Sequence, residues 1–138
     1  MRAAQILIRS SQQTSSGRSD LAIEVEGSVT SKEETTYLTY KEPEGTGLDN
    51  TTTTLKLEKD KVTLIRTGST TLRQVFKAGE ITTGVYQTPY GNFALEVDAK
   101  EVKVELIKDK GKITLQYDLI IAGEKIEDQK LNIFYYSI

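Results

Sequence analysis

The sequence contains no cysteine and no histidine in 138 residues, and these two absences remove most of the familiar catalytic and metal-binding chemistry. Without cysteine the chain has no disulfides, no thiolate metal sites and no cysteine nucleophile. Without histidine it has no serine–histidine–carboxylate triad, no imidazole zinc ligand and no histidine general base. We therefore expect a protein that is not an enzyme and that holds no metal and no cofactor.

Long apolar runs and clustered positive charge are also missing. No stretch approaches the roughly 18 apolar residues of a membrane-spanning helix, and the apolar stretch between Met1 and Arg9 is too short for a signal peptide. The formal net charge is -2, and lysine and glutamate are interspersed, so we expect no nucleic-acid partner. The expected location is the cytoplasm, without a membrane span.

What the sequence does contain is a strict alternation of apolar and polar residues, which is the period of a β-strand. Clear examples are the runs at 4–8, 21–25 and 113–119, and the runs at 93–97 and 102–106 read as two separate strands. Turn residues separate the runs, and Thr88-Pro89-Tyr90-Gly91 fits a type I turn. The pattern predicts about ten strands joined by short turns.

Short successive turns favour an up-and-down meander over a Greek key, whose return connection is long. Closing such a sheet into a barrel removes two hydrophobic edges that would otherwise promote aggregation. No linker, low-complexity tract or internal repeat divides the chain. We predict an all-β fold in which residues 1–138 form a single closed antiparallel up-and-down β-barrel of about eight to ten strands.

Four segments also resemble a known family in their order and spacing over nearly the whole chain. They are Tyr37–Glu42, Val62–Gly68, Tyr86–Gly91 and Gly111–Tyr117, and they are similar to the YwiB-like family of small uncharacterised bacterial proteins. The resemblance implies a calycin-like, or lipocalin-like, barrel, a Gram-positive bacterial source and no established activity. Barrels of the calycin kind include carriers of lipids and other small apolar ligands, but a fold does not determine a function.

Arg66 is the charge of greatest interest, because it continues the apolar phase of Leu64 and should therefore point into the barrel. A guanidinium there could bind the carboxylate of a ligand through both of its oxygens. Glu42, in phase with Tyr40, is the candidate internal partner, and simple exposure of Arg66 is the third alternative. If Arg66 and Glu42 are buried and paired, we expect Arg66→Ala to cost about 3–5 kcal/mol.

Tyrosine is the main aromatic residue, with seven tyrosines and no tryptophan. Tyr40, Tyr86 and Tyr117 lie within predicted strands, where their hydroxyls either reach a polar ligand in the lumen or simply cover a sheet face. Tyr135 and Tyr136 are adjacent and must point to opposite faces, so that the exposed one could belong to a self-association surface.

Two functional hypotheses follow. In the first, the barrel is an intracellular binding module for a small apolar or amphipathic ligand, with Arg66, Glu42, Tyr40, Tyr86 and Tyr117 as the ligand-binding candidates. In the second, side chains fill the barrel, and the protein is a structural or protein-interaction unit that forms a homodimer. A continuous lumen of at least about 300 Å³ would favour the first hypothesis.

Overall fold

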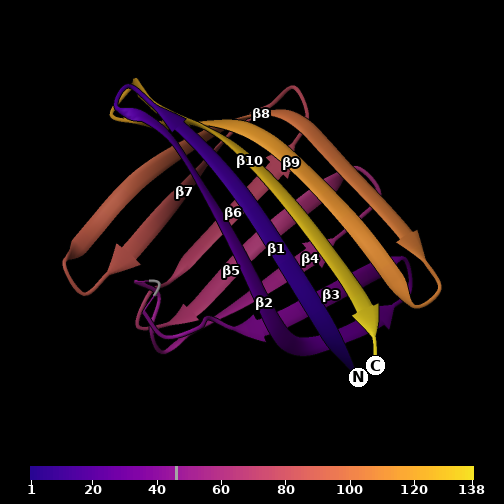
Figure 1. The fold of residues 1–138 in the computed structure, drawn as a ribbon. Coiled ribbons are helices and arrows are strands. Elements are labelled where there is room, and N and C mark those ends of the chain that lie inside the picture. The colour runs from indigo at the N-terminus through magenta and orange to yellow at the C-terminus, as the bar shows by residue number, and fades with distance from the viewer. Residues whose placement is uncertain (46) are drawn as a thin grey trace.

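The computed structural model describes residues 1–45 and 47–138, which form ten β-strands and the turns between them (Figure 1). The strands are β1 (Arg2–Thr14), β2 (Gly17–Lys32), β3 (Thr35–Lys41), β4 (Thr51–Leu57), β5 (Lys61–Gly68), β6 (Leu72–Lys77), β7 (Ile81–Thr88), β8 (Gly91–Ile107), β9 (Lys110–Ile121) and β10 (Glu124–Ser137). Within these residues, no helix is long and apolar enough to cross a membrane.

Each strand pairs antiparallel with its neighbours in a single sheet of order β6-β5-β4-β3-β2-β1-β10-β9-β8-β7. Because β1 pairs with β10, the two termini lie side by side, as Figure 1 shows. The two ends of the sheet, β6 and β7, are consecutive in the chain and meet to close the barrel. The predicted all-β, up-and-down antiparallel barrel is confirmed.

The closure between β6 and β7 is less regular than the other strand pairings. Thr71, just before β6, and Gln87 of β7 exchange two backbone hydrogen bonds of 2.9 Å at an isolated bridge. Further along the seam, the side chain of Gln74 donates to the hydroxyl of Thr82 at 2.9 Å. The barrel is therefore nearly closed, with a seam that relies partly on side chains.

The strands differ greatly in length, and this leaves one long edge free. β2 has 16 residues and pairs with β1 through residues 17–29, but it pairs with β3 only through residues 28–32. Residues 18–27 therefore form a strand edge that has no backbone partner among the described residues. The hairpin of β1 and β2 extends beyond the short strands β3 to β6.

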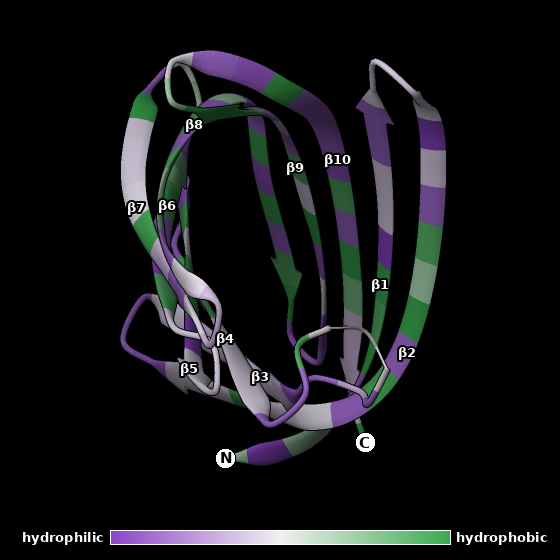
Figure 2. Ribbon diagram, turned by 90° about the vertical axis from the view of Figure 1, so that its left-hand side faces the viewer, coloured by the Kyte–Doolittle hydropathy of each residue, from purple (hydrophilic) through white to green (hydrophobic). Residues whose placement is uncertain are grey.

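The apolar residues of the alternating pattern mostly face the interior of the barrel, and the polar residues mostly face outward. Figure 2 shows this alternation as green (hydrophobic) and purple (hydrophilic) bands along the strands. The inward residues at one end of the barrel pack into a solid core. Its fully buried members include Ala4, Ile6, Leu38, Leu57 and Ile133. Tyr135 is buried in this core whereas Tyr136 is exposed, as the opposite faces of adjacent strand residues require.

Two details differ from the sequence pattern. The runs at 93–97 and 102–106 form one strand, β8, whose register with β9 shifts between Ala99 and Glu101. That bulge reverses the phase, so that Val97 before it and Val102 after it both pack toward the core. The predicted loop between Ser10 and Ser19 is in fact mostly strand, and the predicted loop after Glu42 includes residue 46, which lies outside the described residues.

Candidate functional site

The barrel encloses a cavity of about 620 Å³ between the solid core and the opposite end. Leu21 and Phe93 line it and are about half exposed, so the cavity is open to solvent on that side. Its deep wall is apolar and includes Leu55, Leu115 and Ile133. Polar side chains lie among these; they are Ser10, Gln12, Tyr40, Glu42, Arg66, Gln74, Tyr86, Tyr117, Glu127 and Gln129.

All five residues that the sequence predicts for the site, Arg66, Glu42, Tyr40, Tyr86 and Tyr117, line this one cavity. They come from β3, β5, β7 and β9 and from the residue that follows β3. Strand phase brought Tyr40, Arg66 and Tyr117 to the interior, because each follows the apolar alternation of its own strand. In β7 the apolar residues Ile81 and Val85 are exposed instead. Tyr86 contributes from the seam strand β7 and is only partly buried.

Three neighbouring strands place Tyr40, Thr53 and Arg66 in one inward row. Tyr40 pairs with Thr53 across β3 and β4, and Thr53 pairs with Arg66 across β4 and β5. Thr53 is fully buried and its hydroxyl donates a hydrogen bond to Oε2 of Glu42. Glu42 is thus held at the β3 side of the row by a threonine.

The expected ion pair between Arg66 and Glu42 is absent, and the predicted pairing is wrong. Strand β4 lies between β3 and β5, and two successive strand spacings separate the two residues by roughly 10 Å of sheet. Thr53 satisfies the Glu42 carboxylate instead. Arg66 makes no hydrogen bond or ion pair with any described residue, and its Nε is buried without a partner.

Arg66 nevertheless acts electrostatically on two buried tyrosines. Burial raises the pKa of Tyr40 well above its ordinary value, the negative charge of Glu42 raises it further, and the positive charge of Arg66 lowers it. Burial also raises the pKa of Tyr117, against the opposing charge of Arg66. The guanidinium therefore lies in the field of both phenols, within the same interior.

Tyr117 is held in place from two sides. Its hydroxyl donates a hydrogen bond to Oε1 of Gln129 on β10, and its ring packs on Phe76 with the ring centroids 4.8 Å apart. Glu127 lies two residues before Gln129 on β10 and lines the same cavity. Burial raises the pKa of its carboxyl group. The sequence analysis did not identify Glu127 or Gln129, although both continue the inward phase of Leu131 and Ile133 on the same strand.

Gln74 is a further interior polar residue that the sequence analysis passed over. Its side chain is 2% exposed, and its Nε2 donates to the hydroxyl and the backbone carbonyl of Thr82. Since a carbonyl only accepts, these bonds identify Nε2 and leave Oε1 as a buried acceptor without a partner. A signal was available: Gln74 occupies an apolar phase between Leu72 and Phe76.

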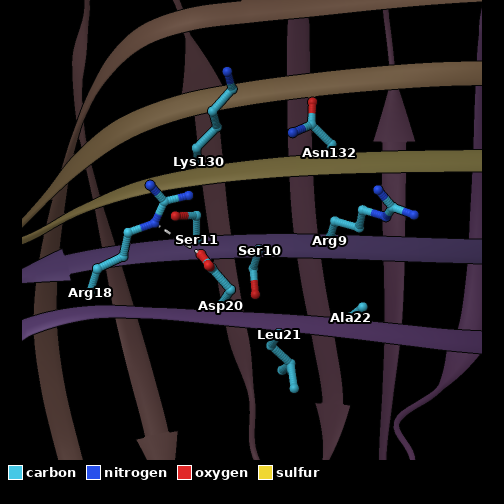
Figure 3. A pocket seen from close by; sticks show the side chains of 9 residues that line it. All are labelled: Arg9, Ser10, Ser11, Arg18, Asp20, Leu21, Ala22, Lys130 and Asn132. Atoms are coloured by element: carbon cyan, nitrogen blue, oxygen red, sulfur yellow. Dashed lines mark hydrogen bonds and ion pairs between the residues drawn. The ribbon is translucent and has the colours of Figure 1, made fainter.

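A second hollow, of about 530 Å³, lies on the outer face of β10, β1 and β2 (Figure 3). It is lined by three cationic side chains, Arg9, Arg18 and Lys130, and by one carboxylate, Asp20. Oδ1 of Asp20 lies 3.2 Å from Nε of Arg18. These side chains are exposed, and ion pairs in that setting contribute little. No three acidic side chains in the described ranges are grouped so that they could hold a metal ion. The interior cavity is the stronger candidate site.

Comparisons with known proteins agree with the fold. The family model described as "Domain of unknown function (DUF1934)" matches residues 6–133. The curated "Uncharacterized beta-barrel protein YwiB" of Bacillus subtilis (strain 168) is 27% identical over 104 residues, which are 75% of this chain and 72% of that protein.

A solved structure, "Crystal structure of ywiB protein from Bacillus subtilis", superposes with a TM-score of 0.89 at 21% identity and covers 99% of this chain and 92% of that one. The resemblance noted in the sequence is confirmed, and the structural match supports the barrel fold. Both comparisons name the ywiB protein of Bacillus subtilis, and neither description states an activity, so the function has to be argued from the residues that line the interior.

Proposed function

The chain belongs to the family described as a domain of unknown function (DUF1934), and because that membership carries no activity, we propose from the barrel interior that the protein binds a small amphipathic molecule. The observation that carries the proposal is the cavity of about 620 Å³. That volume lies within the range of about 300–1,000 Å³ that small-molecule sites occupy. On this proposal the protein is a cytoplasmic binding module rather than an enzyme.

The distribution of side chains supports an amphipathic ligand over a purely apolar one. Leu55 and Leu115 offer an apolar wall for a hydrocarbon part, and burying such a part is favourable by about 25 cal/mol per Å². Arg66, Tyr40 and Tyr117 offer donors and charge for a polar end. A purely apolar ligand would leave these polar groups buried without compensation, which costs free energy.

Native mass spectrometry tests the proposal directly. Protein purified gently from its own host should carry an excess mass that disappears on denaturation and is recovered in a solvent extract. Leu95→Trp should reduce that mass, since Leu95 lines the cavity and the indole would occupy part of it. The matched control is Ala94→Trp, whose exposed neighbouring position lies on the outer face of the same strand. A clean ligand-free mass for the wild-type protein would refute the proposal.

The free edge of β2 favours a second candidate function, self-association. An unpaired edge is a template for another strand, and the one between residues 18 and 27 carries no proline and no bulge. If two copies pair antiparallel about Leu21, Arg18 of each copy lies opposite Glu24 of the other. Both side chains are on the outer face, so this register joins opposite charges across the interface.

Because the chain has no cysteine, single-cysteine variants report the register of such a dimer without background. Leu21→Cys should form a disulfide-linked dimer on oxidation, whereas Val25→Cys, which this register places opposite Gly17, should not. Sedimentation velocity that finds only monomer across the accessible concentrations excludes this function.

A further inference from the structure

Resting on the proposed function, we propose that the ligand is a carboxylic acid and that its carboxylate binds Arg66. The reason is the state of Arg66 itself. It is partly buried, its Nε is fully buried, and its guanidinium has no hydrogen bond or ion pair with any described residue. A partly buried cation without an ion-pair partner is costly once a ligand displaces water from the cavity, and no described carboxylate lies within ion-pair distance of the guanidinium. A ligand anion is the group that completes this arrangement.

The residues around Arg66 explain why no internal partner reaches it. On either side in the sheet it faces Thr53 and Leu72, neither of which carries a charge. The hydroxyl of Thr53 is already donated to Glu42. The hydroxyl of Tyr117 is donated to Gln129. These hydroxyls are neutral and could only accept from the guanidinium, so none of these neighbours supplies the negative charge that Arg66 lacks.

The charges of the interior select the kind of anion. Arg66 shares the cavity with two carboxylates, Glu42 and Glu127, so the lining has more negative than positive charge. A phosphate group, which carries about 1.5 to 2 negative charges near neutral pH, would be repelled more strongly than a carboxylate, which carries one. The planar guanidinium matches the two oxygens of a carboxylate, and the apolar wall then receives the rest of the molecule.

A matched set of probes tests this inference: dodecanoic acid, 1-dodecanol and dodecyl phosphate, titrated into delipidated protein by calorimetry. We expect the dissociation constant of the acid to be at least about tenfold lower than that of the alcohol. A hydrogen bond to a charged group contributes enough free energy to change the affinity by about tenfold or more. Arg66→Met should remove that preference. The matched control is Arg73→Met, an exposed arginine on the outer face of β6, which should leave binding unchanged.

The variant Arg66→Lys keeps the charge and loses the planar fork, so its preference for the acid should fall between the wild type and Arg66→Met. Equal binding of acid and alcohol, a preference for dodecyl phosphate, or an acid preference that survives Arg66→Met would each overturn the carboxylate inference while leaving the binding function standing. Failure of every probe overturns the inference for this class of acid, and native mass spectrometry then decides the proposed function independently.

Discussion

Raising the pH above 10 should destabilise this protein through two buried tyrosines, Tyr40 and Tyr117. Their side chains are 7% and 9% exposed, and burial holds the pKa of each phenol well above its ordinary value of 10.0. In the unfolded chain both phenols ionise near pH 10. In the folded barrel both stay protonated, because a phenolate would have to lose its hydration in an apolar interior.

The direction and size of the effect follow from proton linkage. Above pH 10 the unfolded state binds fewer protons than the folded state, so the free energy of unfolding falls as the pH rises, until the raised folded pKa is reached. From about pH 11 each tyrosine contributes a limiting slope of about 1.4 kcal/mol per pH unit, so that the pair contributes about 2.7 kcal/mol per unit. This contribution is fully present below pH 10.

Urea unfolding at pH 9, 10 and 11 measures the slope, and tyrosinate absorbance follows the ionisation without interference because the chain has no tryptophan. Tyr117→Phe should reduce the total fall in the free energy of unfolding between pH 9 and pH 11 by about 1.4 kcal/mol, because the unfolded phenol goes from mostly protonated to mostly ionised across that range. Tyr90→Phe is the control, since Tyr90 is 94% exposed and should titrate alike in both states. A slope in Tyr117→Phe equal to that of the wild type, or seven tyrosines ionising together near pH 10, would refute the reasoning.

Three further predictions concern single substitutions. Gly27→Ala should cost on the order of 1–3 kcal/mol in urea unfolding, because the new Cβ would lie 2.2 Å from the backbone oxygen of Thr39; an unchanged midpoint would contradict this packing. Leu38→Ala, at a fully buried position, should cost about 2–5 kcal/mol by the same assay, and a loss below about 1 kcal/mol would argue against the core described. Arg66→Met should leave the free energy of unfolding of the ligand-free protein unchanged or raised in the same assay. A decrease of about 3–5 kcal/mol in that free energy would indicate the buried pair with Glu42 that the structure lacks.

Much of the fold and of the candidate site follows from local covalent geometry. Successive side chains on a strand point to opposite faces, so the alternation around Leu64 and Leu115 was enough to turn Arg66 and Tyr117 into the barrel. The short turns were enough to order the strands as a meander, because they allow only neighbouring antiparallel pairs. These inferences needed no knowledge of which distant segments meet.

The rest depended on contacts between segments far apart in the chain. The β3-β4-β5 register places Thr53 between Glu42 and Arg66 and so leaves Arg66 without the partner that its phase suggested. The pairing of β10 with β9 sets Gln129 opposite Tyr117, so that Gln129 accepts the hydrogen bond of the Tyr117 hydroxyl. The cavity and the free edge of β2 likewise result from how long strands and short ones close together. Strand phase is a property of each segment alone, whereas register, bulges and interior volume are set by hydrogen bonds and packing between segments, and only the tertiary structure decides them.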